Sequence, residues 1–303
     1  MNTSTLIALQ WHPVALSHKA RYDAILQEAP CQSADRAFAN LYIWNEAYHQ
    51  EIAFLEDVAL VRFGEAGRYQ YLPPIGKGDL RQAVDTLLES EPHLTLAAAT
   101  EKEVAWLLDR YPNTFDVTET RDLADYLYEV TSLSTLAGKK LHAKRNHINA
   151  FTAEHQWSVR PLGPEDGEIC LDIARAWGNA QEGADTALER RAIERAFSAF
   201  SELELYGALL TVDGEPTAFT VGSVLPGGVL NVHFEKALPE RSGAYPVINR
   251  EFVRMMEKER PELKLVNRED DMGLENLRRA KLSYRPAILL NKFALVQRPV
   301  GQN

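Results

Sequence analysis

The 303-residue chain has only two cysteines, Cys31 and Cys170, which lie far apart and outside any Cys-x-x-Cys pattern. Their scarcity excludes a disulfide framework and a zinc ribbon. No apolar run approaches the ~18–20 residues that a membrane-spanning helix needs, so no transmembrane segment is expected. The first residues show no basic stretch followed by a long apolar one, so no secretory signal is expected either. These absences favour a cytoplasmic protein.

Several common active-site motifs are also missing. The chain has no Gly-x-Ser-x-Gly elbow, no Gly-x-x-x-x-Gly-Lys-Ser/Thr phosphate loop and no Gly-x-Gly-x-x-Gly dinucleotide loop. His142 and His147 are five residues apart, which is not the i, i+4 spacing of a zinc-binding pair, so no metal is predicted. The net charge of 33 − 43 = −10 argues against non-specific coating of nucleic acid but allows a local basic site.

The composition that remains is that of a globular protein, with 45% hydrophobic and 25% charged residues. At roughly 150 residues per domain, the length predicts about two domains. In the first half, Asp79 is expected to cap a helix over 80–90, and residues 57–63 and 69–72 to form a hairpin. We predict an N-terminal lobe over 1–130, a helical connector over 131–154 and a C-terminal lobe over 155–303.

The second half follows the element order β-α-α-β-β-β-α-β-α-β. Its central hairpin joins strands 217–225 and 229–236 through Pro226-Gly227-Gly228. The last strand is expected at 287–296. This order is the one expected of the α/β acyltransferase fold related to the acetyl-CoA N-acetyltransferases, an analogy of fold that says nothing about substrate.

The connector carries four positive charges and no acid between Lys139 and Asn149. On a helical period, His142, Asn146 and Asn149 share one face. Such a face can bind a phosphate or the acceptor end of a tRNA, and it can equally be a solvated basic helix. The residues predicted to bind substrate here are Lys140, His142, Lys144, Arg145, Asn146, His147 and Asn149.

A second candidate is the strand Asn231-Val232-His233-Phe234-Glu235-Lys236. Strand alternation predicts that Asn231, His233 and Glu235 point to one side. A histidine beside a carboxylate is a standard general-base arrangement, because the acid fixes the tautomer and stabilises the imidazolium. The strand therefore predicts His233 and Glu235 as catalytic residues, and the alternative is an exposed strand face.

A third candidate is Asn267-Arg268-Glu269-Asp270-Asp271-Met272-Gly273, which follows strand 263–267 and precedes helix 274–281. Ligands in open α/β sheets bind at the carboxyl ends of strands, although these acids can equally cap the helix. We expect strands 229–236 and 263–267 to be neighbours, with His233, Glu235, Asn267 and Glu269 converging. Further predicted substrate-binding residues are Lys236, Tyr245, Asp271, Lys281, Ser283 and Tyr284.

These segments together resemble a bacterial family of soluble proteins related to the C-terminal domain of phosphatidylglycerol lysyltransferase. The resemblance spreads over roughly residues 38–292. Its motifs are Asn40-Leu41-Tyr42-Ile43-Trp44, Tyr71-Leu72-Pro73-Pro74-Ile75-Gly76, Gly138 to Asn149, His233-Phe234-Glu235-Lys236-Ala237, Gly243-Ala244-Tyr245, Asn267 to Gly273 and Leu277 to Tyr284.

The resemblance implies two tandem acetyltransferase-like lobes, as in the Fem-type peptidoglycan aminoacyltransferases. The related lysyltransferases move an aminoacyl group from charged tRNA to a lipid head group without a cofactor. An aminoacyl transferase acting on aminoacyl-tRNA, with an amine or hydroxyl on a small molecule or lipid head group as acceptor, is therefore the first hypothesis. A CoA-dependent N-acyltransferase is the second, although Glu240 stands where the pyrophosphate-binding turn before Gly243 usually has Gln or Arg. A non-catalytic binding protein on a transferase fold is the third.

Overall fold

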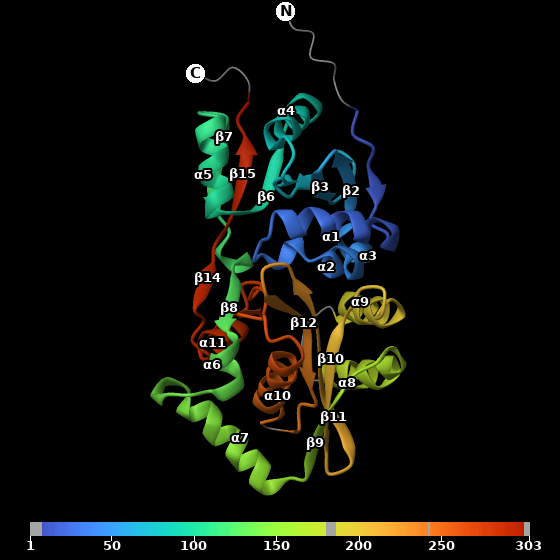
Figure 1. Ribbon diagram of the computed structural model, residues 1–303, viewed down its shortest axis with the longest axis vertical. Helices are drawn as coiled ribbons and strands as arrows, with labels where there is room; N and C mark the ends of the chain where they lie inside the picture. Colours follow the sequence, from blue (N-terminus) through green and yellow to red (C-terminus); the bar gives the residue numbers. More distant parts are fainter. Residues whose placement is uncertain (1–7, 180–185, 242, 300–303) are drawn as a thin grey trace, which may run out of the picture. The chain divides into compact units, whose positions relative to one another are not determined.

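Two units, each with its own β-sheet, make up the chain in the computed structural model, which describes residues 8–179, 186–241 and 243–299 (Figure 1). The first unit contains the residues up to Ala124 together with those from Leu290 onward. The second unit runs from Asp125 to Leu289. Both sheets carry helices, so the mixed α/β class predicted from the sequence is confirmed.

The first unit is built on a sheet with the strand order β1-β2-β3-β4-β6-β15-β7, and β5 pairs with β3. Its strands are β1 His12–Pro13, β2 Glu51–Leu55, β3 Val58–Phe63, β4 Gln70–Tyr71, β5 Ile75–Gly76, β6 Thr95–Thr100, β7 Phe115–Glu119 and β15 Lys292–Gln297. Its helices are α1 Lys19–Glu28, α2 Phe38–Ile43, α3 Asn45–Tyr48, α4 Leu80–Ser90 and α5 Glu101–Arg110.

Local signals explain parts of this unit. The Asp79 carboxylate accepts a hydrogen bond from the Gln82 backbone N–H at 2.9 Å, which is the predicted cap of α4. Strands β3 and β4 pair antiparallel, as the predicted hairpin requires. In α4 the buried residues Ala83, Val84 and Leu87 follow helical spacing and join one core with Leu60 and Leu96 of the sheet.

The second unit is built on a sheet with the order β14-β8-β13-β12-β11-β10-β9. Its strands are β8 Asp125–Glu129, β9 Trp157–Pro161, β10 Tyr206–Val212, β11 Glu215–Leu225, β12 Val229–Ala237, β13 Leu265–Asn267 and β14 Ile288–Leu290. Its helices are α6 Val130–Thr135, α7 His142–Glu154, α8 Gly167–Asn179, α9 Thr186–Ser198, α10 Ala244–Glu259 and α11 Glu275–Leu282. The predicted element order is confirmed, except that the last strand divides into β14 and β15.

Helix α10 covers one face of this sheet, and α8 and α9 lie on the opposite side (Figure 1). Val247, Ile248 and Phe252 of α10 are buried at helical spacing in one core with Leu230 and Val232 of β12. Burying a side chain as large as Phe252 stabilises the fold by about 1.5–3 kcal/mol. We call the two sides the α10 face and the α8 face.

The boundaries of the units differ from the predicted lobes in two ways. The predicted connector belongs to the second unit, because Leu141, Ile148 and Phe151 are buried in the α10 core. Strand β15, predicted to lie in the C-terminal lobe, pairs instead with β6 and β7 of the first unit. Which sheet a strand joins is decided by pairing between distant segments, and a local sequence pattern does not contain that information.

Candidate functional site

The strand β12 continues past its parallel neighbour β13. The two strands pair from Val229↔Leu265 to Asn231↔Asn267, where β13 ends, whereas β12 runs on to Ala237. This confirms that the two strands are adjacent. The carboxyl end of a strand beside a longer neighbour is a usual place for ligands in α/β sheets.

A β-bulge lies in β12 just beyond this point. Opposite β11, Val221 pairs with Phe234 and the next residue, Gly222, pairs with Val232, so His233 is the extra residue. The bulge reverses the alternation of side chains along β12. Ser223 and its partner Asn231 therefore share the face of Lys236, whereas Glu235 lies on the other face.

The partners of these side chains confirm the assignment. Glu235 accepts a hydrogen bond from Asn249 of α10 at 2.9 Å, so it lies on the α10 face. Lys236 pairs with Glu189 of α9 at 2.8 Å and lies 3.5 Å from the centroid of the Trp177 ring of α8. The prediction that Asn231, His233 and Glu235 point to one side is wrong for Glu235, because the extra residue shifts the alternation.

On the α8 face, four polar side chains form what we call the histidine cluster: Ser223, Asn231, His233 and Glu269. Nε2 of His233 lies 2.8 Å from the Ser223 hydroxyl, and Nδ1 lies 3.3 Å from Oε1 of Glu269. Asn231 donates to the same Glu269 oxygen at 2.8 Å and its Nδ2 lies 3.2 Å from His233 Nδ1. The imidazole is fully buried, and Glu269 keeps 23% of its side chain exposed.

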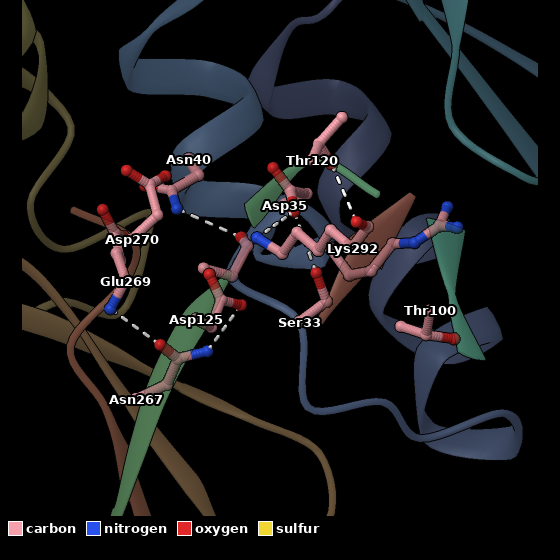
Figure 2. Close-up of polar contacts among 12 residues, drawn as sticks. Ser33, Asp35, Asn40, Thr100, Thr120, Asp125, Asn267, Glu269, Asp270 and Lys292 are labelled. Atoms are coloured by element: carbon pink, nitrogen blue, oxygen red, sulfur yellow. Dashed lines mark hydrogen bonds and ion pairs between the residues drawn. The ribbon is translucent and has the colours of Figure 1, made fainter. Parts of the chain in front are cut away.

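The loop after β13 positions Glu269 (Figure 2). The Glu269 backbone N–H donates to the Asn267 side-chain carbonyl at 2.7 Å, and the Asn267 amide donates to Asp125 at 2.9 Å. Glu269 has a left-handed backbone conformation, with φ of 57°, which costs a non-glycine residue about 1–2 kcal/mol. His233, Asn267 and Glu269 thus converge as predicted, without Glu235.

On the α10 face, Glu235 belongs to a second group, which we call the arginine cluster: Lys144, Glu235, Asn249, Arg268 and Tyr284. Arg268 and Glu235 form an ion pair at 2.7 Å with 13% and 10% of their side chains exposed. The Arg268 guanidinium lies 4.9 Å and the Lys144 ammonium 4.2 Å from the centroid of the Tyr284 ring. In the described part of the chain, Arg268 Nη1 and Asn249 Oδ1 are buried and make no hydrogen bond.

The electrostatics of this cluster leave an excess of positive charge. Burial lowers the pKa of Lys144, and repulsion from Arg268 lowers it further. Burial raises the pKa of Tyr284 to about 12, because the phenolate is disfavoured in an apolar environment. Two cations and one carboxylate around a single ring favour binding of an anionic group.

Lys281 binds the backbone of the loop that follows β13. Its ammonium donates to the backbone carbonyls of Arg268, at 2.6 Å, and of Asp270. Burial and the nearby Arg268 charge lower the pKa of Lys281 to about 8, although Glu269, Asp270 and Asp125 act in the opposite direction. Lys281, which was predicted to bind substrate, thus contacts the loop that carries Arg268 and Glu269 in this structure.

The predicted basic face of the connector is largely exposed. Lys140, His142, Asn146, His147 and Asn149 all lie on the surface, and Asn146 Nδ2 is 3.1 Å from His142 Nδ1. Arg145 donates to the carbonyls of Gly138, at 2.8 Å, and of Leu136, so it closes the turn before α7. Lys144 is the connector side chain that reaches the arginine cluster.

The remaining residues that were predicted to bind substrate contact other parts of the protein. Asp271 accepts hydrogen bonds from Tyr126 at 2.5 Å and from Arg278 at 2.8 and 2.9 Å. Burial acts to raise the pKa of Asp271, but these hydrogen bonds outweigh it and lower the pKa. Ser283 is half-buried and donates to the Ala280 carbonyl, and Tyr245 is half-buried, which raises the pKa of its hydroxyl.

Sequence reasoning missed Ser223, Asn249 and Arg268 as members of a site. The register of the hairpin through Pro226-Gly227-Gly228 places Ser223 opposite Asn231, and this signal was available in the sequence. No sequence pattern predicted the ion pair between the buried Lys292 and the partly exposed Asp35, which are 2.5 Å apart in the first unit (Figure 2). Lys292 lowers the pKa of Asp35 against the opposing effect of burial.

No group of three or more His, Cys, Asp or Glu side chains suited to a metal ion occurs among residues 8–179, 186–241 and 243–299. Within the same ranges, no helix combines the length and apolarity required to cross a bilayer.

Comparison with known proteins relates most of the chain to one family. The family described as "Phosphatidylglycerol lysyltransferase, C-terminal" matches residues 27–296. An uncharacterized protein of Mycoplasmoides gallisepticum is 25% identical over 197 residues, which are 63% of this chain and 61% of that relative.

Solved structures share the fold. A conserved protein of unknown function from Bacteroides thetaiotaomicron is 32% identical, with a TM-score of 0.91 over 96% of this chain and 100% of that one. L-PGS from Bacillus licheniformis is 13% identical, with a TM-score of 0.64 over 93% and 92% of the two chains. FemX is 7% identical, with a TM-score of 0.63 over 94% and 96%. The fold is thus the tandem acetyltransferase-like fold expected from the resemblance.

Proposed function

The chain belongs to the phosphatidylglycerol lysyltransferase C-terminal family, and on that premise we propose that it transfers an aminoacyl group from aminoacyl-tRNA to an amine or hydroxyl acceptor. The acceptor is carried by a small molecule or a lipid head group. Aminoacyl esters are already activated, so the enzyme must mainly position the reactants, accept a proton and stabilise the oxyanion.

The observation that carries the proposal is the pair formed by the buried imidazole of His233 and the partly exposed Glu269 beyond the end of β13. The Glu269 carboxylate 3.3 Å from Nδ1 stabilises an imidazolium, which lets Nε2 accept a proton. Glu235 is less suited to this role, because Arg268 and Asn249 already occupy its two oxygens. His233 is therefore the proton acceptor in this proposal, and Glu269 the positioning residue.

The arginine cluster supports binding of the phosphate-rich donor. Arg268 has a buried N–H group with no hydrogen bond in the described residues, and Lys144 lies at the same tyrosine ring. Arginine and lysine together suit a phosphate oxygen, because both donate charge-assisted hydrogen bonds. Lys140 and His147 are exposed on the same connector and are further candidates for donor contacts.

The test is to incubate the pure full chain with labelled aminoacyl-tRNAs and candidate acceptors and, separately, with acyl-CoAs. We expect acceptor-dependent release of the label from tRNA, with a loss of about 10²–10⁴-fold in rate for His233→Ala. His155→Ala is the matched control, because His155 also pairs with a carboxylate, that of Asp213 at 2.9 Å.

The other outcomes refute the proposal in distinct ways. Turnover of acyl-CoA alone would make the chain a CoA-dependent N-acyltransferase. Saturable binding of tRNA or CoA without turnover of either would make it a binding protein on a transferase fold. Equal rates for His233→Ala and His155→Ala would remove the histidine cluster from the mechanism.

A further inference from the structure

The histidine cluster contains a hydroxyl, an imidazole and a carboxylate in series. The Ser223 hydroxyl is 2.8 Å from Nε2 of His233, and Glu269 Oε1 is 3.3 Å from Nδ1 of the same ring. Ser223 is 8% exposed, and the three residues come from β11, β12 and the loop after β13. Nε2 thus faces a group that can lose a proton, and Nδ1 faces a group that holds negative charge, with the Asn231 amide nitrogen 3.2 Å from the same Nδ1.

We propose that Ser223 is a nucleophile that forms a covalent acyl-serine ester, with His233 as its base and Glu269 as the residue that orients the base. An adjacent base within hydrogen-bond reach activates a serine hydroxyl, and a third group must fix the base. The substrate class is an activated acyl ester. That this ester is an aminoacyl-tRNA rests on the function proposed above.

The proposal requires one tautomer of His233, with the proton on Nδ1. An ionised Glu269 can only accept, so its oxygen 3.3 Å from Nδ1 favours this tautomer, which leaves the lone pair of Nε2 toward Ser223. Asn231 donates to the same carboxylate oxygen at 2.8 Å, which fixes Glu269 in place. The side-chain oxygen Oδ1 of Asn231 is buried with no partner among the described residues and is available to a donor on the ligand, such as an α-ammonium group.

The bulge in β12 removes Glu235 from the side of the strand that carries the histidine cluster. In a regular strand His233 and Asn231 would point the same way as Glu235, but the extra residue separates Glu235 from them. Gly222 allows the close approach of the two strands here, because a Cβ at that position would lie 2.5 Å from the Asn231 carbonyl oxygen. The irregularity therefore leaves Glu269, and not Glu235, as the carboxylate beside His233.

The reaction balances with groups already present. The Ser223 proton passes to His233 Nε2 as Oγ bonds to the acyl carbon, and the bond from that carbon to the leaving hydroxyl oxygen breaks. His233 returns the proton to the leaving oxygen. An amine, a hydroxyl or water then attacks the serine ester and gives its proton to His233, which passes it to the departing Ser223 oxygen. With water as the acceptor, the chain is an ester hydrolase.

The experiment uses the full chain with p-nitrophenyl acetate and with a fluorophosphonate probe. We expect an initial burst of about one nitrophenolate per chain and a mass increase on the peptide that contains Ser223. Ser223→Ala should abolish both, Ser223→Cys should restore a burst through a thioester, and Glu269→Gln should slow acylation about 10²–10⁴-fold. Ser134→Ala, at another buried serine, is the control and should keep the burst.

The results separate this proposal from the function above. Transfer from aminoacyl-tRNA that persists in Ser223→Ala, with no probe on Ser223, overturns the nucleophile and leaves direct transfer standing. Burst and labelling without any use of aminoacyl-tRNA overturns the proposed donor and leaves the nucleophile standing. Labelling that is equal in Ser223→Ala and in the native chain places the reaction at another residue and also refutes the proposal.

Discussion

Lys281 offers a direct test of the electrostatics around the loop that carries Arg268 and Glu269. The residue is 8% exposed, and its pKa of about 8 compares with an ordinary value of 10.5. Burial is the main cause, and the Arg268 charge adds to it, whereas Glu269, Asp270 and Asp125 favour the charged form. We predict that the stability contributed by Lys281 depends on pH in the window between these two values.

The sign follows from proton binding. Between pH 8 and 10.5 the unfolded chain keeps a proton on Lys281 and the folded chain does not, so stability relative to a variant without this group rises with pH. The difference of 2.5 units, at about 1.4 kcal/mol per unit, corresponds to about 3 kcal/mol across the window. Below pH 8 both states are protonated, and the difference is constant.

Urea unfolding of the native chain and of Lys281→Met from pH 7 to pH 10.5 measures this directly. As the pH rises, the free energy of unfolding of the native chain should increase by about 3 kcal/mol relative to that of Lys281→Met. Other groups titrate equally in both proteins and cancel. Lys258→Met, at an exposed position on α10, should show no such gain. A stability difference between the native chain and Lys281→Met that is independent of pH would refute the account of a lowered lysine pKa.

Four further predictions concern neighbouring contacts. Glu235→Gln leaves Arg268 without its buried partner and should lower the free energy of unfolding by about 3–5 kcal/mol in urea, while adding Arg268→Met should recover part of it. Asp271→Asn should lower the free energy of unfolding by about 3 kcal/mol near pH 7. This difference should fall as the pH drops below 4, because the lowered pKa of Asp271 contributes stability only while the carboxyl is ionised in the folded chain. Gly222→Ala should lower the melting temperature, corresponding to about 1–3 kcal/mol, since its Cβ meets a backbone oxygen. Lys144→Met should reduce the slope of log tRNA affinity against log salt by about 0.7–0.9 for the lost phosphate contact, whereas Lys258→Met should not.

The parts of the fold that local signals control were predictable. The Asp79 cap, the hairpin through Pro226-Gly227-Gly228 and the order of elements in the second half all follow from residues close in sequence. The adjacency of β12 and β13 was also predicted, from the expectation that the second half forms a transferase lobe.

What the sequence could not reveal depends on contacts between distant segments. Strand β15 looks like any other apolar strand, and nothing in its residues indicates that β6 and β7 are its partners. Arg268 was not predicted as a site residue, because its partner Glu235 lies 33 residues earlier in the sequence, on a neighbouring strand. The exposed residues of α7 were predictable from helical spacing, but the contact of Lys144 with Tyr284 needs the helix packed in place.

The single residue that most changes the interpretation of the site is the extra one in β12. With regular alternation, Glu235 would be the carboxylate beside His233, and no other acid would be needed. The bulge moves Glu235 to the α10 face, where it neutralises Arg268, and the carboxylate that faces His233 comes from Glu269 instead. Glu269 reaches it in a left-handed conformation that costs about 1–2 kcal/mol. A bulge in β12 and a left-handed residue in the loop after β13 therefore lie at the same place, and the product is one histidine held between a hydroxyl and a carboxylate. Backbone strain of this kind is found mostly at functional sites, because elsewhere the packing of a strand would not retain it. The histidine cluster is therefore the part of this molecule to test first.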